Sequence, residues 1–114
     1  MKFTSTTLRS IYLMLCDLRP FCNWSLPIAD EIIFVASNDT DAMGTYIYDD
    51  TKEKHVLTVS KAKNGHLDTV IKTMAHEMIH MKRGNTSKWD KHDAVFRRYA
   101  HQISKELGFD AHEL

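Results

Sequence analysis

The chain has 114 residues, of which 43% are hydrophobic and 26% are charged. This composition fits one folded domain spanning residues 1–114, and it excludes both a multidomain protein and a disordered chain. Fifteen basic residues balance fifteen acidic ones, so the net charge of zero gives no support for strong nucleic-acid binding.

The first half of the chain predicts one helix and three strands. Apolar residues recur at helical spacing over residues 8–18, and Pro20 ends the pattern. Strands are expected at 31–36, 45–48 and 55–60, where β-branched and aromatic residues gather. Three strand side chains are expected to face the core: Ile47, Leu57 and Val59.

The second half predicts two helices, at 66–82 and 91–107, and Gly108 is a natural stop for the second. The apolar stripe of the first is made by six residues: Leu67, Val70, Ile71, Met74, Met78 and Met81. The complete order is helix, three strands, helix, helix. We therefore expect an α+β domain with an N-terminal helix, a three-stranded antiparallel sheet and two further helices.

Residues 76–80 read His-Glu-Met-Ile-His. Residues four apart lie on one face of a helix, so His76 and His80 can bind the same zinc ion. Glu77 between them is then placed to act as a general base. Both histidines lie opposite the apolar stripe, so they face either water or a second packed element. The alternative is an ordinary helix surface that carries two histidines by chance.

Catalytic zinc usually has three protein ligands and one open position for water. His92 lies four residues before Phe96 and continues the apolar stripe of the helix at 91–107, so it is expected to point inward as the third ligand. The alternative is a histidine that only packs or caps the helix start. His101 falls on the opposite side and is expected to be solvated. Two carboxylates are the reserve candidates: Asp90 and Asp93.

These residues resemble the SprT-like metallopeptidases, the family that includes the Spartan proteases of DNA–protein crosslink repair. The resemblance covers residues 30–110 and rests on four stretches: Gly-Thr-Tyr-Ile-Tyr at 44–48, the strand at 55–60, Thr-Met-Ala before the motif at 76–80, and Lys-His-Asp at 91–93 with Phe96 and the ending Leu-Gly-Phe at 107–109. It implies a small zincin-like domain whose metal ligands are His76, His80 and His92, with Glu77 as general base.

The same resemblance implies a zinc-dependent endopeptidase whose substrates are proteins, including DNA-associated proteins. In zincin-type sheets an edge strand can hold an extended peptide beside the metal by backbone hydrogen bonds. Four side chains are candidates for stabilising the oxyanion: Tyr46, Tyr48, Tyr99 and His66. The chain departs from the family at Asp93, where a glycine is common, and it shows neither a cysteine zinc ribbon nor long tails. These departures remove support for DNA targeting and leave the catalytic motif untouched.

Two other functions stay open. The first is a catalytically inactive zincin-fold module that acts through protein–protein interaction, although Glu77 favours catalysis because such a module gains nothing from that residue. The second is a structural zinc site with a protein side chain, such as Asp90 or Asp93, as fourth ligand.

We expect an intracellular protein, cytoplasmic or in the nucleoid or nucleus, that acts as a monomer on protein or peptide substrates. Cys16 and Cys22 have neither metal-site nor redox spacing, which fits reduced thiols. Arg9 and Asp17 interrupt the N-terminal apolar stretch, so it does not resemble a signal peptide. No apolar run is long enough to cross a bilayer, and no membrane contact is expected.

Overall fold

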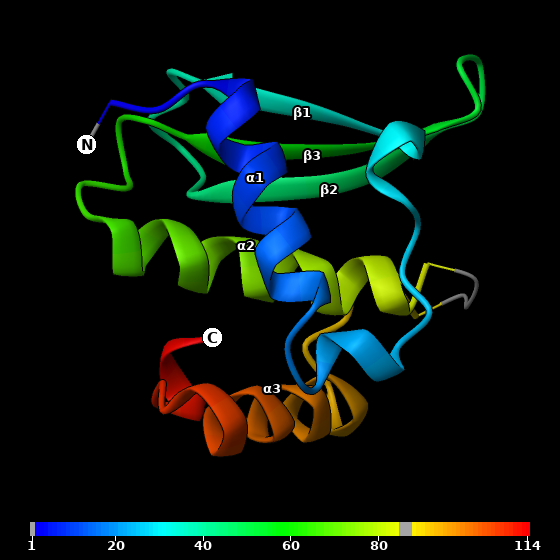
Figure 1. Ribbon diagram of the computed structural model, residues 1–114, viewed down its shortest axis with the longest axis vertical. Helices are drawn as coiled ribbons and strands as arrows, with labels where there is room; N and C mark the ends of the chain where they lie inside the picture. The colour runs from blue at the N-terminus through cyan, green and yellow to red at the C-terminus, as the bar shows by residue number, and fades with distance from the viewer. Residues whose placement is uncertain (1, 85–87) are drawn as a thin grey trace.

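The computed structural model describes residues 2–84 and 88–114 (Figure 1). Its main elements are α1 (Ser5–Cys16), β1 (Ile32–Ser37), β2 (Gly44–Asp49), β3 (Lys54–Ser60), α2 (Leu67–Lys82) and α3 (Ala94–Leu107). Three short 3-10 helices complete them: η1 (Phe21–Asn23), η2 (Ala29–Glu31) and η3 (Ala111–Glu113). The predicted α+β class is confirmed, and in the described residues no helix is long and apolar enough to cross a membrane.

The sheet is mixed, so the prediction of a fully antiparallel sheet is wrong. Its strand order is β1-β3-β2, with β3 antiparallel to β2 and parallel to β1. The last strand in the sequence therefore inserts between the first two. Leu57 and Val59 make β3 the most deeply buried strand, and the centre of a sheet is where such a strand has neighbours on both edges. This order leaves β2 as an edge strand.

The buried face of β2 is carried by Tyr46, which pairs with Leu57 across the sheet. Leu57 and Val59 face the core as predicted, whereas Ile47 is 51% exposed and lies on the uncovered face, so its predicted core position is wrong. The sequence Tyr-Ile-Tyr presents large side chains on both faces of the strand, and the hydrophobic pattern alone therefore does not fix which face packs.

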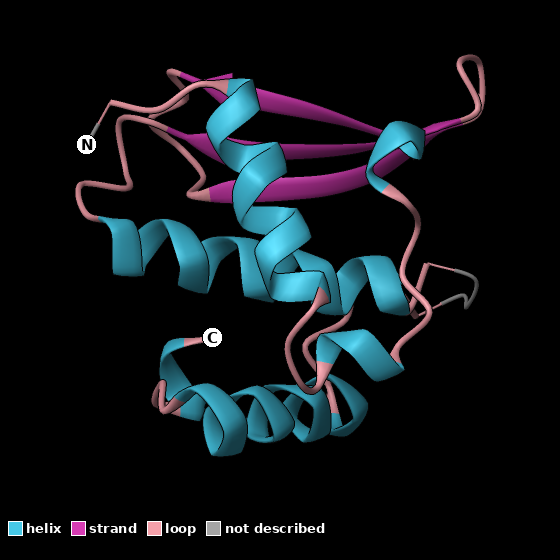
Figure 2. Cartoon of the chain, viewed as in Figure 1, coloured by secondary structure: helices cyan, strands magenta, loops and turns pink. Residues whose placement is uncertain are grey.

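The helices cover one face of the sheet and extend away from its β2 edge (Figure 2). Helix α1 begins with a capping box between Thr4 and Thr7 and packs on β1. Helix α2 packs on β2 and β3 through its predicted apolar stripe, except that Leu67 in the first turn is 51% exposed. Helix α3 packs on the opposite side of α2, which is the side that carries the histidines.

Helix α3 starts later than the apolar pattern predicts. The side chain of Asp93 accepts a hydrogen bond from the backbone N–H of Phe96 and caps the helix, whose first residue is Ala94. His92 therefore precedes the helix instead of forming its first turn. Gly108, with a φ of 82°, ends the helix in the left-handed conformation, as predicted.

The orientation of the strand side chains, with Leu57 in the core and Ile47 outside it, is testable with two matched truncations. Leu57→Ala should lower the free energy of unfolding by about 3 kcal/mol, because it opens a cavity at a fully buried position. Ile47→Ala should lower it by less than about 1 kcal/mol, because the side chain is half exposed. Urea denaturation followed by circular dichroism measures both. Equal losses of unfolding free energy would contradict the burial of Leu57 and the exposure of Ile47.

Candidate metal centre

Three imidazole nitrogens converge at one point between α2 and the segment that leads into α3. The Nε2 atoms of His80 and His92 are 3.0 Å apart, and the Nε2 atom of His76 is 3.2 Å from each of them. Nitrogens about 2.1 Å from one tetrahedral zinc ion would be roughly 3.4 Å from each other. The three predicted ligands thus lie together, and their spacing is within a few tenths of an ångström of that of a zinc site.

The ring orientation of the two helical histidines is fixed by main-chain carbonyls. His76 Nδ1 donates to the carbonyl oxygen of Leu114 at 2.9 Å, and His80 Nδ1 donates to that of Trp89 at 2.8 Å. A carbonyl oxygen can only accept, so the proton of each neutral ring is on Nδ1, and the Nε2 lone pair is free. Two such lone pairs 3.2 Å apart repel each other, and a cation between them removes the repulsion.

Burial keeps these rings neutral. It lowers the pKa of His76 to about 4 and also lowers the pKa of His80, because a charged imidazolium loses its hydration there. The neighbouring rings shift both pKa values in the same direction. A neutral imidazole is the form that binds a metal ion, so protons compete weakly for this site near neutral pH. The donor set therefore fits a divalent ion such as zinc.

A buried arginine holds the third histidine in place. Arg83, at the end of α2, donates to the carbonyl oxygen of Lys91 at 2.9 Å and to both carboxylate oxygens of Asp93, at 2.8 and 3.0 Å. These bonds fasten the residues on either side of His92. The guanidinium also holds the pKa of Asp93 well below its usual range. Arg83 is buried, and with these bonds it acts as a positioning residue.

The reserve ligands do not reach the centre. Within the described residues, one cluster of three or more histidine, cysteine or acidic side chains could hold a metal ion. It consists of the three histidines alone. Asp93 is occupied by Arg83, and Asp90 is exposed and outside the group. A fourth protein ligand is therefore absent from the described part of the chain, which disfavours a closed structural site. His101 is exposed, as predicted.

Glu77 lies beside the centre and is withdrawn from water. Only 6% of it is exposed, and burial raises its pKa from 4.5 to about 7. It lines a hollow of about 260 Å³ together with His76, the first residue of β2 and the C-terminal segment. Across this hollow Lys72 forms an ion pair with Glu113 at 2.7 Å. A small molecule in the hollow would contact both the carboxyl group of Glu77 and the side chain of His76.

The close approach of β2 to α2 depends on a glycine and an asparagine that the sequence does not single out as site residues. A Cβ atom on Gly44 would lie 2.7 Å from Thr73 Cγ2 and 3.4 Å from Glu77 Cγ. Thr73 Oγ1 donates to the fully buried Asn64 at 2.7 Å, and Asn64 donates to the carbonyl oxygen of Met43. This network fixes the start of β2 over Glu77. A glycine opening a strand is the one signal in the sequence for such an approach.

The candidates for oxyanion stabilisation lie apart from the three imidazoles. The hydroxyl group of Tyr46 is hydrogen-bonded to His55 Nδ1 at 2.8 Å, and the ring of Tyr48 packs on His55. Tyr99 packs on Trp24, and His66 is an exposed residue at the start of α2. None of the four has a hydrogen bond or ring contact with the imidazoles in the described structure.

Comparisons of the chain with protein families, curated proteins and solved structures find no match. The resemblance to SprT-like peptidases therefore rests on the residues that carry it.

The burial of Glu77 should make the metal-free protein less stable as pH rises. Its folded pKa is about 7 against 4.5 when exposed, so the unfolded chain ionises first. The resulting loss of unfolding free energy is absent below pH 4.5 and grows up to about pH 7. Above that pH it reaches its full value of about 3 kcal/mol. Glu77→Gln should therefore match the wild type at pH 4 and exceed its stability at pH 8, in denaturation with a chelator present.

The exposed Glu106 provides the control, because Glu106→Gln makes the same chemical change at a position outside the hollow. The titration of His76 is common to all three proteins and cancels in the comparison. A Glu77→Gln difference that stays constant from pH 4 to pH 8 would contradict the burial argument.

Proposed function

We propose that the protein is a zinc-dependent metalloendopeptidase in which His76, His80 and His92 hold the ion. The observation that carries the proposal is the convergence of their Nε2 atoms. In His76 and His80, the main-chain acceptors keep the proton on Nδ1, so the Nε2 lone pair points at the site. A bound zinc ion would supply Lewis acidity toward a peptide carbonyl and toward water. The three-ligand set leaves room for such a substrate, as catalytic sites require.

Glu77 is the proposed general base. In a hollow bounded by β2 and the C-terminal segment, its carboxylate can accept a proton from the attacking water and then donate that proton to the departing amine nitrogen. Burial raises its pKa, and a cation bound at the adjacent imidazoles would lower it. The two effects oppose each other, so the carboxylate stays available as a base near neutral pH.

Substrate would be held on the edge of the sheet. Among the described residues, strand β2 has a hydrogen-bonded neighbour only on its β3 side, and it begins at Gly44, against Glu77. An extended polypeptide can pair with the other edge through main-chain hydrogen bonds, which requires no particular side chain. This placement supports an unfolded or extended protein segment as the substrate, and it favours an endopeptidase that acts on other proteins.

The metal site is tested first by its composition. The purified protein should hold about one zinc ion per chain. His92→Ala should weaken zinc binding by roughly 100-fold or more, because it removes one of three ligands, whereas His101→Ala should leave it unchanged. Elemental analysis and competition with a chromogenic chelator measure both. Loss of zinc in His101→Ala with retention in His92→Ala would refute the assigned ligand set.

The reaction is tested by Glu77→Gln, which keeps the shape of the side chain and removes its basicity. This variant should retain zinc and cleave denatured casein at least about 100-fold more slowly than the wild type. The assay is run with and without single-stranded DNA and is read by mass spectrometry of the products. Equal cleavage by both proteins would assign the activity elsewhere. Zinc binding with no cleavage by the wild type in either condition would favour the inactive binding module.

A further inference from the structure

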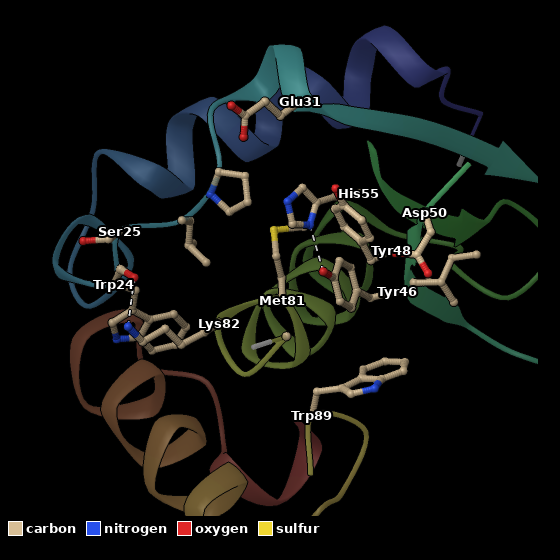
Figure 3. A pocket seen from close by; sticks show the side chains of 14 residues that line it. Trp24, Ser25, Glu31, Tyr46, Tyr48, Asp50, His55, Met81, Lys82 and Trp89 are labelled. Atoms are coloured by element: carbon tan, nitrogen blue, oxygen red, sulfur yellow. Dashed lines mark hydrogen bonds between the residues drawn. The ribbon is translucent and has the colours of Figure 1, made fainter. Parts of the chain in front are cut away.

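A cleft of about 1000 Å³ lies at the far end of β2, between the β2–β3 end of the sheet, η2 and the C-terminal end of α2 (Figure 3). We call it the aromatic cleft, because five of its lining residues carry aromatic rings: Trp24, Tyr46, Tyr48, His55 and Trp89. The catalytic proposal above uses none of these side chains.

Four of these rings, those of Tyr46, Tyr48, His55 and Trp89, contact one another and form one continuous wall. Tyr46 packs edge-on against Trp89, with ring centroids 5.7 Å apart, and stacks on His55 at 5.9 Å. Tyr48 packs edge-on against His55 at 5.0 Å and is 47% exposed. Tyr48 is therefore more accessible to a ligand than the buried Tyr46, and the faces of aromatic rings carry the negative potential that attracts cations.

Two carboxylates also line the cleft. Figure 3 shows Glu31 and Asp50 on different sides of the cleft. In the described structure neither side chain has an ion pair or a hydrogen bond. Lys82 also lines the cleft, but its ammonium group donates to the main-chain oxygen of Trp24 at 3.0 Å. The cleft therefore has an excess of one negative charge, and its carboxylates are available to a ligand.

The cleft is joined to the metal centre through two elements. Trp89 lines the cleft, accepts the hydrogen bond from His80 Nδ1 through its main chain, and has its ring centroid 6.4 Å from that of His80. Strand β2 starts beside Glu77 at Gly44 and reaches the cleft at Tyr48, which is about 14 Å along an extended strand. A polypeptide paired with the edge of β2 would therefore run past both.

We propose that the aromatic cleft binds an arginine side chain of the polypeptide substrate, a few residues away from the bond that is cleaved; this inference rests on the proposed peptidase function. A guanidinium group stacks on aromatic rings and pairs with carboxylates in its plane, which uses both features of the cleft. A purely apolar side chain would leave Glu31 and Asp50 near an apolar ligand without partners. The same two carboxylates repel the phosphates of a nucleic acid.

Binding is measured first, on the zinc-loaded Glu77→Gln protein so that no turnover intervenes. The probes are acetylated nonapeptides of alanine and serine with one arginine at each position in turn, each matched to a peptide with the neutral isostere citrulline. Titration calorimetry should show about tenfold tighter binding of the arginine peptide at one or two adjacent positions. Equal binding of both peptides at every position would overturn the proposal.

Two double variants separate the cleft from general charge. Glu31→Gln with Asp50→Asn should reduce the arginine preference to about twofold or less, because it removes both carboxylates of the cleft. Asp17→Asn with Glu106→Gln makes the same change of net charge at exposed positions outside the cleft and should keep the preference. An equal loss in both, or displacement of the arginine peptide by oligothymidylate, would overturn the assignment.

Cleavage distinguishes this inference from the function on which it rests. Wild-type protein should cut the arginine peptides at a fixed distance from arginine, and the Glu31 and Asp50 double variant should lose that preference, whereas the Asp17 and Glu106 double variant should keep both the preference and the wild-type rate. Cleavage with no preference for arginine would overturn the cleft and leave the peptidase function standing. Selective arginine binding without cleavage would support the cleft and contradict the peptidase function.

Discussion

Two hydrogen bonds from imidazole Nδ1 atoms to main-chain carbonyls determine what the centre of this protein can do. They place the proton of His76 and of His80 on the side away from the site, so that the Nε2 lone pairs meet. His92 brings a third nitrogen to the same point. Such an arrangement is electrostatically unfavourable by itself and favourable around a cation, which is why the geometry indicates a metal site more strongly than the presence of histidines does.

The acceptors of these bonds lie outside the helix that carries the motif. One belongs to Trp89, in the segment that Arg83 fastens to the end of α2, and the other to Leu114, beyond α3. The packing of α3 against α2 thus does more than cover a helix face. It supplies both the third nitrogen and the groups that orient the first two, so the loss of that packing would remove His92 from the other two rings and leave those two without their acceptors.

A second constraint acts from the sheet side of α2. The absence of a side chain at Gly44 lets β2 approach Glu77, and the buried Asn64 fixes that approach. The carboxyl group is thereby removed from water, at a cost to stability that the bound ion would offset. The same strand continues to the aromatic cleft, where the main chain of Trp89 accepts the hydrogen bond from His80. The proposed substrate binding and the proposed chemistry would in this way lie along one strand edge.

The amino-acid sequence by itself determined the α+β class and the placement of His76 and His80 on one helical face, because both follow from local periodicity. It also pointed to His92, although the helix that suggested it begins only after Asp93. Tertiary structure decided the strand order, the exposure of Ile47, and the roles of the carbonyl acceptors. Those depend on which segments distant in the chain pack together, and a main-chain carbonyl has no residue type by which a sequence pattern could reveal it.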